Sequence, residues 1–157
     1  MVIGKGLSTQ ADVRNDTPPM TQWLQDNGEM AEQIRAHDWA NTPLGPLEHW
    51  PDALKTTVSL SLASHFPQAI VWGPELITIF NDAFKPILGS KPLALGHPFS
   101  TIWKEAWRYI GPIAEAAFAG KATYIENFPL VVERGAGPEQ AYFTFCYSPI
   151  RDSQGHI

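Results

Sequence analysis

The side chains that could do chemistry in this chain are one cysteine, Cys146, and five histidines. They do not occur at the spacings of a metal site, such as the helical repeat of H-E-x-x-H or the pair in C-x-x-C. The sequence also lacks a G-x-S-x-G nucleophile elbow and the glycine-rich loops that bind phosphate. It therefore predicts no metal site and no catalytic residue. The five histidines are His37, His49, His65, His97 and His156.

Two of these side chains could serve a cofactor, and for both a structural role is the favoured interpretation. His97 precedes segment 101–119, which is predicted to be helical and to line the core, so His97 could ligate haem. A surface histidine in a loop is favoured instead. Cys146 lies in a predicted strand, where a small side chain on one face of a sheet is favoured. A single cysteine also excludes an intrachain disulfide.

Aromatic side chains form the best candidate for a binding site. Along segment 140–150, aromatic residues alternate with smaller ones, so a strand would point all the aromatic rings to one face. An apolar cavity with a few polar groups suits a small ligand. Rings that pack solidly against one another form an ordinary core instead. The sequence leaves both alternatives open. The candidate cavity residues are Phe84, Trp103, Trp107, Phe143, Phe145 and Tyr147.

The element that must position these residues is segment 66–89. Two β-prone runs, Gln68–Trp72 and Leu76–Phe80, flank a Gly-Pro-Glu turn, which predicts a hairpin. Asn81 follows at once and is a good N-cap for a short helix. Gly89 is placed to end that helix.

The rest of the domain is predicted as helices and then a second hairpin. Segment 101–119 contains two helical pieces that Gly111-Pro112 should separate. Segments 122–132 and 140–150 are β-prone and flank a Gly-rich loop. The smaller side chains of the last strand should face away from the helices, where the leader helix could cover them. They are Thr144, Cys146 and Ser148.

Residues 1–64 lead into this domain. Residues 1–28 are polar and are predicted to be disordered. Residues 29–64 are predicted as a helical leader with helices at 29–36 and 51–64, separated by a loop rich in Pro, Gly and Asn. One face of the second helix is apolar, and it could pack on its own domain or on a twin across a dimer. The residues of this face are Leu54, Val58 and Leu62.

This order of elements predicts an α+β fold, with helices on one face of an antiparallel sheet and the domain at residues 65–157. The net charge of −5 and the 11 scattered basic residues argue against nucleic acid as a partner. The sequence shows no signal peptide and no run of about 18 apolar residues. A cytoplasmic protein without a membrane anchor is therefore expected.

Three motifs, in this order and spacing, resemble PAS sensor domains over about residues 66–157. The leader, with Trp39 and Trp50-Pro51 around a T-P-L-G-P sequence, looks like that of PAS modules at the front of bacterial histidine kinases. The three motifs are Asn81-x-Ala83-Phe84, Leu95-Gly96-His97-Pro98-Phe99 and Tyr147-Ser148-Pro149-Ile150-Arg151-Asp152-x-x-Gly155.

The resemblance implies a sensor that holds a small ligand in a cavity on the helix side, forms a homodimer and passes a conformational change to a downstream kinase. The alternatives are a protein-interaction module without ligand and a small ligand-carrying protein. The cofactor stays unknown. Flavin-binding light sensors of this family carry a reactive Cys in an Asn-Cys-Arg motif on a helix, and this chain has no such motif. A flavin photoadduct is therefore disfavoured.

The chain departs from the PAS pattern in one respect. PAS sheets have five strands, and the last strand in sequence lies in the middle; here it would begin at His156 and is absent. The strands at 68–72 and 140–150 would each face an empty slot. About five unpaired peptide groups would cost on the order of 10 kcal/mol, as much as the stability of a whole domain. We therefore expect a fragment of a longer sensor, or a chain that borrows a strand from a partner.

Overall fold

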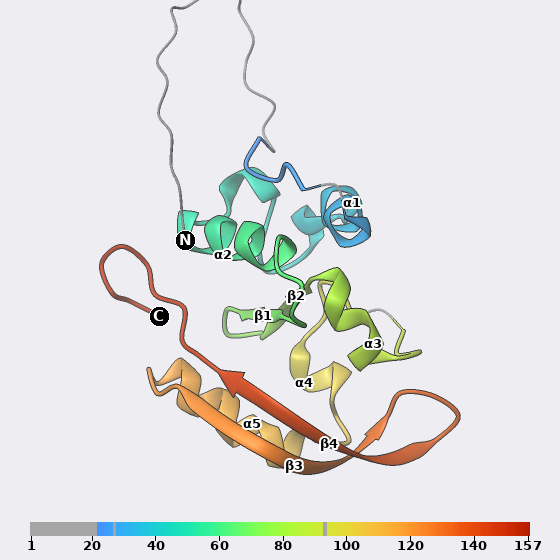
Figure 1. Ribbon diagram of the computed structural model, residues 1–157. Helices are drawn as coiled ribbons and strands as arrows, with labels where there is room; N and C mark the ends of the chain where they lie inside the picture. The colour runs from blue at the N-terminus through green and yellow to red at the C-terminus, as the bar shows by residue number, and fades with distance from the viewer. Residues whose placement is uncertain (1–21, 27, 93) are drawn as a thin grey trace, which may run out of the picture.

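The computed structural model describes residues 22–26, 28–92 and 94–157 (Figure 1). Within them it has an α+β fold with five α-helices and two separate two-stranded antiparallel sheets. The prediction of an α+β fold is confirmed, whereas a single continuous sheet is not observed. The predicted disorder of residues 1–28 concerns mainly residues 1–21 and 27, which lie outside the described residues. Leu24 is buried, so the packed part of the chain begins earlier than predicted.

The leader consists of two α-helices joined by a loop with two 3-10 turns. Trp39 and Trp50 of this loop are both buried, and their ring centroids lie 4.9 Å apart in an edge-on arrangement. The predicted burial of both tryptophans is thus confirmed. Pro51 is the N-cap of the second helix, where its missing N–H costs no helical hydrogen bond. The elements are α1 (Glu29–Ala36), η1 (Trp39–Asn41), η2 (Leu47–His49) and α2 (Asp52–Leu62).

The first hairpin pairs β1 (Ala69–Trp72) with β2 (Ile77–Phe80), each within one residue of its prediction. The outer edge of β2 is occupied by the loop that follows α3. The Thr78 N–H donates to the carbonyl of His97, and the Thr78 carbonyl accepts from the Gly96 N–H. This loop therefore acts as a partial third strand beside β2.

Asn81 ends β2 and begins the next helical segment, as predicted. Its side-chain oxygen accepts a hydrogen bond from the Phe84 N–H at 3.2 Å, which caps the 3-10 turn η3 (Asp82–Phe84). The short helix α3 (Lys85–Leu88) follows and ends at Gly89, whose φ is 60°. A side chain at Gly89 would also collide with the backbone of Arg134 in the second hairpin.

The helices after this segment are α4 (Phe99–Ile102) and α5 (Trp107–Phe118). The predicted break at Gly111-Pro112 is wrong, because α5 runs through both residues. Pro112 is exposed and removes a single helical bond, while the buried face of α5 holds the helix against the core. The ring of Trp107 lies over Gly111, where a side chain would not fit without displacing it.

The second hairpin pairs β3 (Thr123–Glu133) with β4 (Pro138–Tyr147), with a bulge between Ile125 and Phe128. Along β4 the predicted alternation is confirmed. Ala141, Phe143, Phe145 and Tyr147 are half-buried, and the residues between them are exposed.

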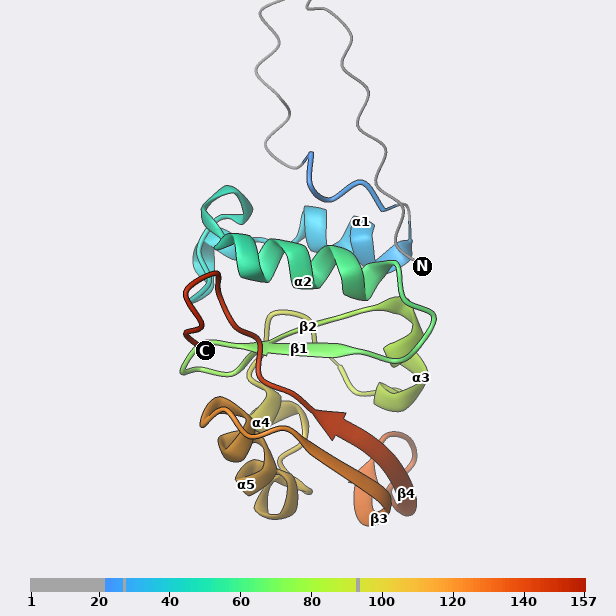
Figure 2. The same ribbon diagram turned by 60° about the vertical axis from the view of Figure 1, so that its left-hand side comes forward.

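The described residues form two apolar cores, one on each side of the β1–β2 hairpin. The leader core includes Trp39, Trp50, Leu54, Val58, Ile70, Ile77 and Ile79. The helix-side core includes Phe80, Leu88, Phe99, Ile102, Trp103, Ile110, Leu130 and Val132. Figure 2 shows α2 above β1 and β2, and α4 and α5 below them.

This arrangement corrects the prediction that α2 could cover the smaller side chains of β4. Helix α2 covers the β1–β2 hairpin instead, where Leu54 packs with Ile70 and Ile79 in the leader core. Thr144, Cys146 and Ser148 are exposed. The physical reason is that α2 is only 11 residues long, and its apolar face already packs on the first hairpin. No apolar face of α2 is left to cover β4.

His37 packs the leader onto the loop beside β2, and we expect this contact to depend on pH. A side chain at Gly96, whose φ is 76°, would strike the His37 ring. Burial lowers the pKa of His37, the nearby His97 lowers it further, and Asp38 opposes the shift. The unfolded chain therefore takes up a proton near pH 6.5 that the folded chain takes up only at lower pH.

Stability should thus be fully present above pH 6.5 and fall as the pH drops towards 5. Chemical denaturation at pH 7, 6 and 5 measures this slope. His37→Gln should flatten it, and His49→Gln, at an exposed histidine, is the matched control. A slope that His37→Gln leaves unchanged would contradict the prediction.

Candidate functional site

The helix-side core is built on Phe99, which α4 directs between the helices and the second hairpin. The centroid of the Phe99 ring lies 6.4 Å from those of Trp103 and Trp107 and 6.3 Å from that of Tyr147. Tyr147 in turn contacts Phe145 at 5.0 Å. These rings connect α4 and α5 with the inward face of β4.

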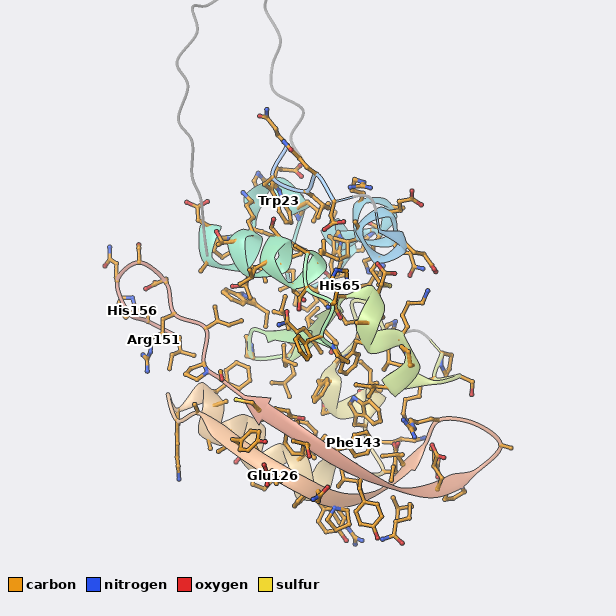
Figure 3. The ribbon with its side chains drawn as sticks, in the orientation of Figure 1. Trp23, His65, Glu126, Phe143, Arg151 and His156 are labelled. Atoms are coloured by element: carbon orange, nitrogen blue, oxygen red, sulfur yellow. The ribbon has the colours of Figure 1, made fainter. Side chains whose placement is uncertain are left out.

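The structure brings most of the predicted cavity residues into this core. Trp103 is buried within it, and Phe84, Trp107, Phe143 and Tyr147 pack against it. Phe145 lies at its margin and contacts Phe128 and Tyr147. Figure 3 shows Phe143 on the second hairpin, and the guanidinium of Arg134 lies 5.6 Å from the centroid of its ring.

Phe99 is the functional candidate that sequence reasoning missed. It belongs to the motif Leu95-Gly96-His97-Pro98-Phe99 that carried part of the resemblance to PAS domains. Its position just after Pro98 marks a helix start, and that signal could have placed its ring on the inner face of α4.

Charged and polar groups border the aromatic rings at the end of β3. Lys91 Nζ lies 2.7 Å from Glu105 Oε1, and both side chains are about nine-tenths buried. Burial raises the pKa of Glu105, but the hydrogen bond from the Glu133 N–H and the pair with Lys91 outweigh it and lower that pKa. Glu105 therefore stays ionised beside the aromatic core.

Two buried polar atoms at this border have no hydrogen-bond partner among the described residues. They are Nε1 of Trp103, a donor, and Oε2 of Glu105, an acceptor. Lys91 also lies 4.9 Å from the centroid of the Trp103 ring. Burial further raises the pKa of the Tyr147 hydroxyl, which keeps it protonated. A polar ligand that entered here would meet a donor and an acceptor that the fold leaves unused.

The two best-defined hollows of the described surface lie away from the aromatic rings. One, of about 630 Å³, lies between the end of α3 and the loop of the second hairpin. The other, of about 180 Å³, lies between the leader loop and the β1–β2 turn. The rings themselves are packed together, so a ligand among them would have to displace side chains. The sequence-based prediction of a ligand cavity stays a prediction.

The second candidate site is a pair of unpaired strand edges. Because the backbone of Thr78 bonds to the loop beside β2, its partner Val71 occupies a non-hydrogen-bonded position on β1. The Asn81 N–H donates to the Gln68 carbonyl, so Gln68 is in a hydrogen-bonded position. The next residue, Ala69, is therefore in a non-hydrogen-bonded position like Val71. The N–H and carbonyl groups of Ala69 and Val71 therefore point away from β2.

The outer edge of β4 is unpaired as well. Among the described residues, β4 is bonded as a strand to β3 alone. Figures 1 and 2 both show β4 below β1, and no strand is drawn between them. We call these two unpaired edges the strand slot, defined by β1 (Ala69–Trp72) and β4 (Pro138–Tyr147).

The predicted dimer face of the leader is largely used inside the chain. Leu54 and Val58 are fully buried in the leader core, which is the intramolecular alternative. Leu62 is half-buried and contacts both cores. Leu60, on the opposite side of α2, is 70% exposed and is the apolar residue that α2 presents outward.

The remaining candidates lie apart from one another. His49, His65, His156 and Cys146 are exposed, and His97 is half-buried. The part of the chain that the structure describes holds no group of three or more His, Cys, Asp or Glu side chains that could bind a metal ion. None of its helices has the length and apolar character needed to span a membrane.

The arrangement thus offers two places where another molecule could bind, an aromatic core with unused polar atoms and a strand slot. Compared with known proteins, the chain matches no protein-family model and no curated protein sequence.

Proposed function

We propose that this chain is a sensory module of the PAS type, which changes conformation when a small ligand or a partner binds. The observation that carries the proposal is the helix-side core, where aromatic rings of α4, α5 and β4 are bordered by two polar atoms that have no partner among the described residues. The three sequence motifs support it. On this proposal the module forms a homodimer, has no catalysis of its own and controls a kinase domain in a longer parent protein.

In such a module, the hydrogen bonds of Asn81 would link the helix-side core to the leader. Its side-chain amide donates to the carbonyls of Ser61 and Ser64 at the end of α2, and its oxygen accepts from Phe84 beside the helix-side core. A shift of the η3 and α3 segment on ligand binding would therefore change how α2 ends. Because α2 carries an exposed Leu60, a second protomer could sense that change.

The ligand prediction is tested by thermal shift with haem, flavins and small carboxylic acids. A true ligand at 100 times its Kd should add about 2.7 kcal/mol to the free energy of unfolding. Trp103→Phe keeps an aromatic ring but removes the unpartnered N–H, so it should reduce the response. Tyr142→Phe, on the exposed outer face of β4, is the matched control and should keep it. A flat response to all ligands would contradict the small-ligand role.

A second candidate function, a protein-interaction module without ligand, is favoured by the strand slot. An unpaired edge presents a row of backbone donors and acceptors that another strand can use. The third possibility, a small ligand carrier or enzyme, has less support, because the inward positions of β4 are aromatic and offer no cluster of ionisable groups.

A further inference from the structure

The larger of the two hollows is a third place where a molecule could bind. It has a volume of about 630 Å³, which is within the range of small-ligand sites. Figure 1 shows its two walls, α3 and the loop between β3 and β4, on the same side of the molecule. We call it the hairpin hollow, defined by Pro86 and Gly89 at the end of α3 and by residues 134–139 of the second hairpin.

Hydrogen bonds from Ser90 hold the backbone of Arg134 against the end of α3. The Arg134 carbonyl accepts from the Ser90 N–H at 2.7 Å and from the Ser90 Oγ–H at 2.9 Å. Gly89 makes this approach possible, because a side chain there would collide with the Arg134 backbone. The Arg134 side chain therefore extends from a fixed point of the wall.

The guanidinium of Arg134 is also held in place. Its Nε–H donates to Glu139 Oε1 at 2.6 Å, and its Nη1 donates to the carbonyl of Ile87 at 3.4 Å. The centroid of the Phe143 ring lies 5.6 Å from the guanidinium, and the Arg134 side chain is 23% exposed. A charged group that is already oriented loses little entropy when it binds a ligand.

Several hydrogen-bonding groups of the hairpin hollow are open to a ligand. Among the described residues, Arg134 Nη2 donates to no acceptor and Glu139 Oε2 accepts from no donor. The N–H groups of Gly135, Ala136 and Gly137 likewise have no acceptor in the described part of the chain. The wall thus offers several donors for a carboxylate and, next to them, an acceptor for an ammonium group.

The two charges of the wall favour a ligand that carries both signs. Because Arg134 and Glu139 are in contact, an anion at the guanidinium would also lie beside a carboxylate. A cation at Glu139 would likewise lie beside the guanidinium. A zwitterion whose charges are adjacent avoids both repulsions, and an α-amino acid has its ammonium and carboxylate groups on one carbon. Pro86, Ala136 and Pro138 offer an apolar part of the wall to its side chain.

We propose that the hairpin hollow is a binding site for a free α-amino acid with an apolar side chain. The carboxylate accepts from Arg134 Nη2 and from N–H groups of the loop at 135–137, and the ammonium group donates to Glu139 Oε2. Because α3 and the second hairpin both line the site, the bound amino acid would connect them. The inference goes beyond the proposed function and does not depend on a ligand in the aromatic core.

The test is isothermal titration of the full chain with L-alanine, L-valine, L-leucine, L-methionine and L-phenylalanine. At least one should bind with a Kd below about 1 mM. The matched probes for the amino acid that binds best are the acid without the amino group and the amine without the carboxylate. For L-leucine these are isocaproate and isoamylamine. Each should bind at least about tenfold more weakly than the amino acid, because it leaves one charge of the wall without its partner.

Glu139→Gln separates the two charges in the protein. It keeps the size of the side chain and removes the partner of the ammonium group, so the amino acid should bind at least about tenfold more weakly. The acid without the amino group should bind more tightly than it does to the unchanged chain, because the repelling carboxylate is gone. Misfolding of the variant would not produce that gain. Glu126→Gln, at an exposed glutamate of β3 outside the hollow, is the matched control and should change neither affinity.

The amide signals of Gly135 and Gly137 in NMR spectra show where the amino acid binds, and both should shift on titration. The proposal would be overturned if none of the five amino acids bound with a Kd below about 1 mM, or if the acid without the amino group bound equally well. Equal effects of Glu139→Gln and Glu126→Gln would do the same. Shifts confined to α4 and α5 would place the amino acid in the aromatic core and would also overturn it. A failed screen with haem, flavins and small carboxylic acids would leave this proposal standing.

Discussion

Replacing Asn81 with alanine is expected to lower the free energy of unfolding by about 4 kcal/mol. The Asn81 side chain is 1% exposed and joins three parts of the chain. Its amide donates to the carbonyls of Ser61, Ser64 and Phe66 at 2.8–3.1 Å, and its oxygen accepts from the N–H groups of Gln68 and Phe84. Alanine would leave these buried backbone groups without partners.

Asn81→Asp separates the two halves of this network. The introduced carboxylate keeps the acceptor for Gln68 and Phe84 but faces three carbonyl oxygens without a hydrogen to donate. Its folded pKa should therefore be raised, so the variant should lose stability as the pH rises through about 4. The control is Asn41→Ala, at an exposed asparagine, which should cost less than about 0.5 kcal/mol. Urea denaturation at pH 4 and 7 measures all three, and equal costs for Asn81→Ala and Asn41→Ala would refute the network.

The second large effect is expected at Trp39, in the centre of the leader core. Trp39→Ala should cost about 4 kcal/mol, because it leaves a cavity against Trp50 and removes a buried hydrogen bond. The Trp39 Nε1–H donates to the carbonyl of Ile34 at 2.7 Å, and the side chain is 2% exposed. The leader would then lose the residue that holds its loop on the β1–β2 hairpin.

Trp39→Phe is the matched variant, since it keeps an aromatic ring and removes only the hydrogen bond and part of the volume. It should cost about 1–2 kcal/mol. Intrinsic fluorescence during urea denaturation measures both variants. If Trp39→Ala cost less than 1 kcal/mol, the leader would not be packed as part of the same folding unit.

The first hairpin, the α1 helix and the cap at Asn81 could be predicted from the sequence because local chemistry determines them. A Gly-Pro-Glu turn between two β-prone runs has few alternatives, and an asparagine directly after a strand is a strong helix start. The alternation along β4 likewise predicted which side chains face the helices. These features depend on neighbours within a few residues.

The features that sequence reasoning missed depend on contacts between distant segments. Gly111-Pro112 looks like a helix break, and only the burial of Ile110 and Ala114 shows why α5 continues. Helix α2 packs on the first hairpin because side chains from several distant segments form the leader core together. The loop beside β2 brings α4 and Phe99 into the helix-side core, and its hydrogen bonds to Leu76 and Thr78 could not be predicted from the sequence.

The unpaired edge of β1 that points away from β2 is tested most directly by hydrogen exchange of single amides in β1, followed by NMR. We predict that the amides of Ala69 and Val71 exchange quickly, whereas those of Ile70 and Trp72, which face β2, are protected. Protection of all four amides in the chain alone would contradict the claim, because the edge would then already be paired.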